Sequence, residues 1–200
     1  MPRRGLLPLF LGIGLAIASL QPVAAQDLQA LHTELRAVKQ RAVDAVNKQD
    51  LEALIQELSP TIQFTAMNNE TFSGLDQARA YYKKMMVGAD RIVESMSMTA
   101  DADNLSLLYA DNRIAVATGS SNTTFKLKGG LSFDVPLRWT ATLESKGPKW
   151  TIAAIHFSAN MFDNPILTGA GLLWKSVAAG VGLGGLLIGF LLGRWRRRAA

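Results

Sequence analysis

The chain has 200 residues, 48% of them hydrophobic, which is enough for one globular domain with flanking segments. Its net charge of +5 would suit an anionic partner. However, residues 26–168 hold 14 basic and 16 acidic residues, a net charge of −2, so the positive charge lies at the two ends of the chain. No basic stripe in the domain predicts nucleic-acid binding. The absence of cysteine excludes disulfides and thiol catalysis, and two histidines, His32 and His156, cannot form a clustered zinc site, so we expect no metal and no cofactor.

Residues 1–25 have the pattern of a secretory signal peptide. The segment MPRR is a short basic region, an apolar stretch follows it, and Val23 and Ala25 are the small residues expected before a cleavage site after Ala25. Arg3 and Arg4 also fit the twin-arginine export route. We therefore expect the chain to be exported, by the general or the twin-arginine route.

Residues 169–193 are typical of a transmembrane helix, and residues 194–200 form a basic tail. Trp174 and Trp195 would be separated by about 32 Å of helix, close to the thickness of the hydrocarbon layer. Because arginines stay on the cytoplasmic side, we expect a cytoplasmic tail and an extracytoplasmic domain, periplasmic in a bacterium. An alternative is that the segment is removed later, as in bacterial C-terminal sorting signals.

Glycines recur at four-residue spacing in this segment, at Gly180 and Gly184 and again at Gly185, Gly189 and Gly193. Such rows let two membrane helices approach closely and would support a homodimer, although glycine is also common in membrane helices without that role.

Residues 26–165 show helix patterns first and strand patterns afterwards. Apolar residues at steps of three and four predict a helix over 27–50. His32 is not part of its apolar stripe, so we expect this side chain at the surface. Asp50 can cap a second helix, a hairpin turning at Asn68 and Asn69 follows, and a third helix covers residues 75–86. Alternating runs then predict strands over 91–102, 113–127, 131–145 and 149–160. This order predicts an α+β domain with helices packed on an antiparallel sheet.

Three stretches resemble the nuclear transport factor 2-like superfamily, specifically its SnoaL-like (polyketide-cyclase-like) members: AVNKQDLEALIQELSPTIQF, FSGLDQARAYYKKM and KWTIAAIHFS. The resemblance covers about residues 30–160 and implies a cone-shaped domain in which a curved sheet surrounds a pocket. The superfamily includes dehydratases, isomerases, cyclases and pocketed domains without known chemistry, so the resemblance implies a fold rather than a reaction.

His156 is the candidate site residue of the last strand. If Gly129-Gly130 and Gly147-Pro148 each close a two-residue hairpin, Trp139 faces both Ser120 and His156 on the apolar side of the sheet. We favour a buried, hydrogen-bonded histidine inside the cone, with a ligand contact or a catalytic acid or base as alternatives.

Other polar residues of this region have less defined positions. Asp134 would share the opposite face with Arg138 and Thr140, so it cannot orient His156 unless Pro136 introduces a bulge. Tyr82 and Tyr109 can enter the cavity, although no spacing places them beside His156.

The sequence thus predicts a membrane-anchored extracytoplasmic domain that binds a small apolar ligand or another protein chain, more a binding or scaffold module than an enzyme. The expected ligand-binding residues are Tyr82, Tyr109, Ser120, Trp139 and His156. One alternative is an isomerase or dehydratase that acts on a hydrophobic carbonyl compound with His156 as acid or base. Another is a structural module that forms a homodimer through the exposed sheet face.

Overall fold

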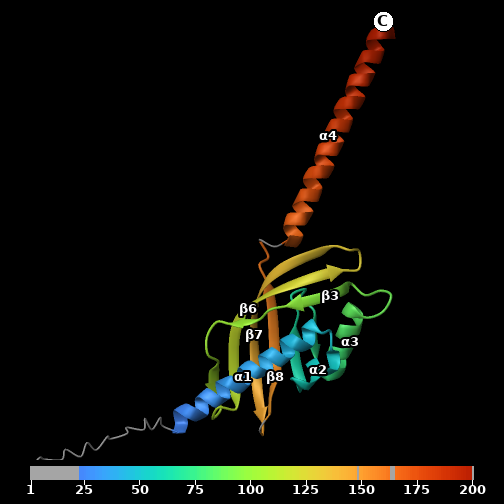
Figure 1. The fold of residues 1–200 in the computed structure, drawn as a ribbon. Coiled ribbons are helices and arrows are strands. Elements are labelled where there is room, and N and C mark those ends of the chain that lie inside the picture. Colours follow the sequence, from blue (N-terminus) through green and yellow to red (C-terminus); the bar gives the residue numbers. More distant parts are fainter. Residues whose placement is uncertain (1–22, 148, 163–164, 200) are drawn as a thin grey trace, which may run out of the picture.

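The computed structural model describes residues 23–147, 149–162 and 165–199, so the expected signal peptide lies outside the described residues except for its last three. Helices α1 (Val23–Asn47), α2 (Leu51–Gln56) and α3 (Gly74–Met86) cover one face of a sheet (Figure 1). The Asp50 carboxylate caps α2 by accepting a hydrogen bond of 3.0 Å from the backbone N–H of Ala53. The predicted positions of these helices are confirmed.

The sheet is curved and almost entirely antiparallel. Its main strands run in the order β2-β1-β8-β7-β6-β3, with β4 and β5 also paired to β6 and with β1 parallel to β8. The strands are β1 (Leu58–Thr65), β2 (Thr71–Ser73), β3 (Val93–Met98), β4 (Asp101–Ala102), β5 (Leu107–Tyr109), β6 (Ile114–Leu127), β7 (Ser132–Lys146) and β8 (Lys149–Ala159). Asn69 has a φ of 66° between β1 and β2, as expected for the predicted hairpin. The α+β prediction is confirmed.

The core lies between α1 and the concave face of the sheet, called the inner face below. Leu35 and Val38 of α1 are buried in one cluster with Trp139 and Leu143 of β7. Gly119 of β6 makes room for the indole of Trp139, because a Cβ at this position would lie 2.2 Å from Trp139 Cζ2. The small residue on β6 and the large one on β7 are therefore a matched pair.

The register of the last three strands differs from the prediction by one residue in two places. The turn after β6 contains three residues, Lys128 to Gly130, and Leu127 N–H donates to the Leu131 carbonyl at 2.8 Å. Gly119, and not Ser120, is consequently opposite Trp139. The predicted position of Ser120 on the inner face is wrong because a two-residue turn was assumed.

A bulge in β8 produces the second difference. Leu143 pairs with Ile152, as a two-residue turn at Gly147-Pro148 requires, but Thr142 pairs with Ala154, so one extra residue is present in β8. Every later side chain changes face because side chains alternate along a strand. His156 is thus opposite Thr140, is exposed, and lies on the convex or outer face of the sheet. The prediction of a buried histidine inside the cone is wrong.

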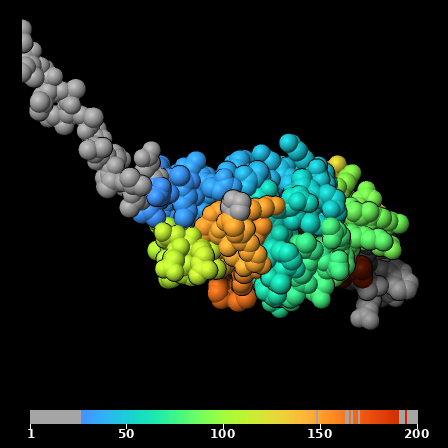
Figure 2. Space-filling view, turned by 90° about the horizontal axis from the view of Figure 1, so that it is seen from below, coloured from blue at the N-terminus to red at the C-terminus, as the bar shows by residue number. Residues whose placement is uncertain are grey.

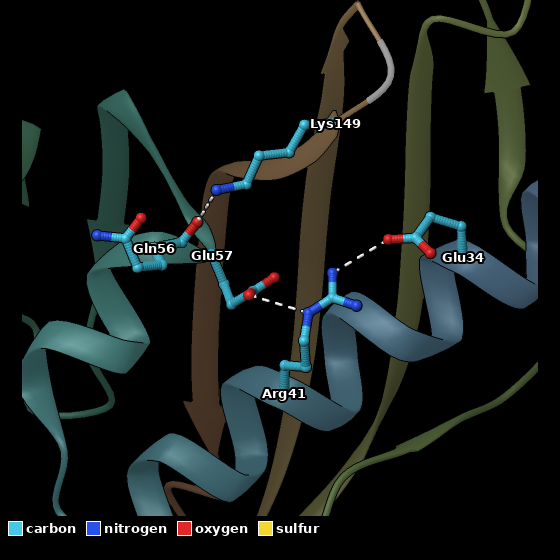
Figure 3. A network of polar contacts seen from close by, with 5 residues as sticks. All are labelled: Glu34, Arg41, Gln56, Glu57 and Lys149. Carbon is cyan, nitrogen blue, oxygen red and sulfur yellow. Dashed lines mark hydrogen bonds and ion pairs between the residues drawn. The ribbon is translucent and has the colours of Figure 1, made fainter.

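A group of polar contacts joins α1 to the end of α2 and to β8 (Figure 3). Arg41 Nε donates to Glu57 at 2.9 Å and Arg41 Nη2 donates to Glu34 at 3.1 Å. Lys149 Nζ donates to the Gln56 carbonyl at 2.7 Å. Glu57 is buried, so Arg41 compensates a carboxylate that would otherwise be costly to remove from water.

Helix α4 (Pro165–Ala199) leads away from the sheet in Figure 1. Its segment Leu167–Phe190 is long and apolar enough to cross a membrane, and large side chains such as Trp174 and Phe190 are exposed.

Candidate ligand-binding site

A cavity of about 770 Å³ lies between the three helices and the inner face of the sheet. Its walls come from α1, α2 and α3 on one side and from β1, β2, β3, β4, β6, β7 and β8 on the other. The volume falls within the range of small-molecule sites. Most of the lining side chains are aliphatic, aromatic or methionine, so this cavity is suited to an apolar molecule.

Aromatic rings form one wall of the cavity. Phe64 and Phe72 are stacked with ring centroids 4.5 Å apart, and Tyr81 lies 5.4 Å from Phe72. Phe157 lies 6.0 Å from Phe64. Burial raises the pKa of the Tyr81 hydroxyl, so this phenol is neutral at physiological pH and suits an apolar environment.

Flexible thioether side chains form a second part of the wall, contributed by Met67, Met85, Met86, Met96 and Met98. Methionine has an unbranched, polarisable side chain that adapts to ligands of different shape. Together with the aromatic wall, these residues favour recognition by apolar contact rather than by a dense set of hydrogen bonds.

The polar groups of the inner face have internal partners. The hydroxyls of Ser121 and Thr123, both buried, lie 3.1 Å apart, and Trp139 Nε1 donates to the Ser120 carbonyl at 2.9 Å. The Tyr82 hydroxyl donates to the Gln49 carbonyl at 2.8 Å, and burial raises its pKa. These hydrogen bonds stabilise the wall.

Besides Tyr81 and Tyr82, four residues with ionisable side chains line the cavity: His32, Arg36, Lys39 and Asp50. The first three lie on α1, and Asp50 caps α2 as described above. His32 is half-buried and belongs to the wall, so its predicted surface position is wrong. It lies one residue away from the buried stripe of α1, and for this reason periodicity alone placed it outside.

The structure places two of the five predicted ligand-binding residues, Trp139 and Tyr82, in the cavity wall. The side chains of Ser120 and Tyr109 are exposed, and neither residue lines the cavity. His156 contributes with Thr65 and Thr140 to a separate, more open groove on the outer face. The five residues therefore do not form one site.

Asp134 is on the outer face, as predicted, but it lies six residues along β7 from Thr140, the residue opposite His156. Thr124 Oγ1 donates to Asp134 at 2.6 Å. Arg138 on the same face forms an ion pair with Asp103, which lowers the pKa of that carboxyl. In the described part of the chain no group of three or more histidine, aspartate or glutamate residues is arranged to hold a metal ion.

Sequence reasoning missed Tyr81, Phe64 and Phe72. Tyr81 and Tyr82 are adjacent on α3 and differ by about 100° in direction, so the sequence did not show which of them faces the aromatic wall. Phe64 and Phe72 are opposite one another in the β1–β2 hairpin because its turn contains three residues, 67–69. A two-residue turn at Asn68-Asn69 would have placed Phe64 opposite Ser73, so the sequence did not give this pairing.

Solved structures with the same fold cover most of the domain. A hexachlorocyclohexane dehydrochlorinase of type 2 matches with a TM-score of 0.60 and 15% identity, covering 70% of this chain and 92% of its own. A nuclear transport factor 2-like protein from Salmonella enterica serovar Typhimurium matches with a TM-score of 0.55 and 18% identity, covering 66% and 92%.

The association domain of CaMKII from Caenorhabditis elegans matches with a TM-score of 0.51 and 14% identity, covering 67% of this chain and 99% of its own. These similarities show the nuclear transport factor 2-like fold. A search of curated proteins gave no match. The family model described as a SnoaL-like domain matches residues 35–162, and the chain therefore belongs to the SnoaL-like domain family.

Proposed function

We propose that the domain binds a small apolar molecule in the cavity between its helices and its sheet. The observation that carries this proposal is the cavity of about 770 Å³ with its aromatic and methionine walls. An apolar ligand of matching shape would gain dispersion contacts with these aromatic and methionine side chains. Binding rather than turnover is proposed because the lining groups are mostly apolar.

The geometry does not favour the alternative of an isomerase or dehydratase with His156 as acid or base. His156 lies on the outer face, beyond the sheet from the cavity. Asp50 lines the cavity, but its carboxylate caps α2 by accepting a hydrogen bond from the N–H of Ala53. A general base must reach the proton that it removes, and His156 cannot reach an atom inside the cavity.

We propose in addition that α4 anchors the domain to a membrane and that residues 1–25 direct export. The support is the apolar length of Leu167–Phe190 and the arginines that follow it in the sequence. In this arrangement the domain with its cavity lies on the extracytoplasmic side of the membrane.

A second candidate function is homodimer formation through the outer face. This face is exposed along β6 to β8, and the association domain of CaMKII has the same fold. Thr140 and His156 lie at its middle, so Thr140→Arg should dissociate such a dimer in sedimentation experiments. A parent protein that sediments as a monomer would refute this candidate.

The cavity proposal can be tested with a photoreactive ligand. The full chain in phosphatidylcholine nanodiscs is irradiated with a long-chain alcohol that carries a diazirine, and labelled peptides are identified by mass spectrometry. Ala117 of β6 lines the cavity, so Ala117→Phe should take up part of it and reduce labelling of the wall. Val116 is next to it and points to the outer face, so Val116→Phe is the matched control and should label like the parent. Equal labelling in both variants would refute the proposal.

A further inference from the structure

We propose that the ligand is an amphiphile whose chain occupies the cavity and whose anionic head group binds a basic strip on α1. The strip consists of His32, Arg36 and Lys39. This inference rests on the proposed function, because it assigns the chemical class of the molecule that the cavity holds. The head group is a carboxylate or a phosphate ester, the anions that arginine and lysine bind best.

The three residues of the strip lie on one side of α1. Their spacing of four and three residues places them in a row on a helix, over about 10 Å of its length. All three line the cavity, whereas Arg41, on another side of α1, is directed to Glu34 and Glu57. This row is therefore the part of α1 where basic side chains border the apolar cavity.

The residues facing the strip across the cavity edge come from segment 100–106. Ala100, Ala102, Asn104, Leu105 and Ser106 line the same cavity. Lys39 Nζ donates to the Ala100 carbonyl, which ties this segment to α1. Figure 2 shows α1 in blue alongside the yellow-green atoms that follow this segment.

The positive charge of the strip has no acidic partner among the described residues. The hydrogen bond of Arg36 goes to the Thr33 hydroxyl at 3.4 Å, and that of Lys39 goes to a carbonyl. The nearby carboxylate of Asp103 is on the outer face with Arg138. Arg36 is exposed, so an anion can reach it from water while an attached chain enters the cavity.

Other ligand classes fit the wall less well. A neutral hydrocarbon would leave the strip without a function, and a polar metabolite would leave the aromatic and methionine walls in contact with polar groups. An anionic amphiphile satisfies both parts of the wall. The proposed membrane anchor would hold the domain at a membrane, whose lipids are one source of such molecules.

The test compares two photoreactive ligands of equal chain length, a diazirine-bearing carboxylic acid and the corresponding alcohol, on the full chain in phosphatidylcholine nanodiscs. The ratio of acid to alcohol labelling at cavity peptides is measured for the parent and for Arg36→Gln. Because partition into lipid is the same for both proteins, it cancels from the comparison. Lys48→Gln is the matched control, since Lys48 is exposed, follows α1 and does not line the cavity.

We expect the ratio to fall about 5-fold in Arg36→Gln and about 10-fold in Arg36→Glu, and to stay unchanged in Lys48→Gln. An unchanged ratio in both Arg36 variants, with normal labelling by the alcohol, would overturn the head-group assignment and leave the cavity proposal intact. Labelling by both ligands that is no stronger than in Ala117→Phe would overturn the cavity proposal and this inference with it. Arg36 is exposed and bonded only within its own helix, so its replacement leaves folding intact.

Discussion

Thr140 and His156 are opposite one another across β7 and β8, and both side chains are exposed on the outer face of the sheet. His156 is therefore separated from the cavity by the sheet itself. The neighbouring residues Trp139 and Phe157, which pair with each other, are the ones that line the cavity. The register of β7 and β8 therefore decides which of their side chains line the cavity.

Replacement of His156 should have little effect on stability. His156→Ala removes an exposed side chain, so we expect the free energy of unfolding to change by no more than about 0.5 kcal/mol. Trp139→Ala, which empties part of the core, should cost about 3–5 kcal/mol. Denaturant unfolding of both variants measures the two changes. A loss of 2 kcal/mol or more in His156→Ala, on the order of a core substitution, would show that the side chain is buried.

Gly119 is required by the indole of Trp139. In Gly119→Ala the new Cβ would lie 2.0 Å from the Asp101 carbonyl oxygen and 2.2 Å from Trp139 Cζ2. We expect a loss of about 1–3 kcal/mol in the free energy of unfolding, because backbone and ring must both move. Gly129 has no atom within 4 Å of the corresponding position, so Gly129→Ala is the control and should be near neutral. Equal free energies of unfolding for the two variants would mean that the indole of Trp139 does not pack against Gly119.

The register of β6, β7 and β8 shows how much of the structure can be predicted from the sequence. The helices and the long strands were predictable because their apolar residues repeat at helix and strand periods. The register was not, because Gly129-Gly130 reads equally well as a two-residue or a three-residue turn. The bulge that follows Ile152 has no glycine or proline to mark it, and each one-residue shift moves a side chain such as His156 to the other face.

The cavity was predictable only in part. Trp139 could be placed on the inner face from the alternation of β7, and the family resemblance implied a pocket. The basic strip on α1 was not found, since His32, Arg36 and Lys39 look like an ordinary solvated face in a single helix pattern. Only the packing of segment 100–106 against α1 shows that this face lines the cavity.

The ionised form of Glu144 should stabilise the fold. The Ser59 hydroxyl donates to this carboxylate at 2.6 Å and Lys146 lies 2.9 Å away, and these contacts lower its pKa. A lowered pKa gives stability above the ordinary carboxyl value of about 4. That contribution is lost as the pH falls through the lowered value in the folded protein.

Glu144→Gln should therefore be less stable than the parent at pH 7, and the difference should narrow below about pH 4. Urea unfolding at a series of pH values measures this change. A difference that stays constant over the whole series would mean that the charge of Glu144 does not contribute.

The proposed anchor predicts a defined topology. With a tag after Ala200, protease added outside spheroplasts should digest the domain and leave the tag intact, because the arginines hold the tail in the cytoplasm. Digestion of the tag would mean that the tail lies outside the cell membrane, the reverse of the proposed orientation. Absence of the tag before protease is added would indicate that the C-terminal segment is removed in the cell.

Residues 26–165 should fold without the flanking segments. They contain all of α1 from Gln26 onward and every strand of the sheet, and the exposed apolar side chains of α4 are left out. We expect a protein of these residues to be soluble without detergent and to melt in one cooperative transition. Aggregation in detergent-free buffer would show that α4 completes the core.

The central claim is that the cavity holds an apolar molecule, and its most direct test is the effect of such a ligand on stability. For residues 26–165 with an apolar alcohol at a hundredfold excess over its Kd, the free energy of unfolding should rise by about 2.7 kcal/mol. The same rise is expected in Val116→Phe and a smaller rise in Ala117→Phe, whose ring takes up part of the cavity. No stabilisation of the parent, or equal stabilisation of both variants, would contradict the account.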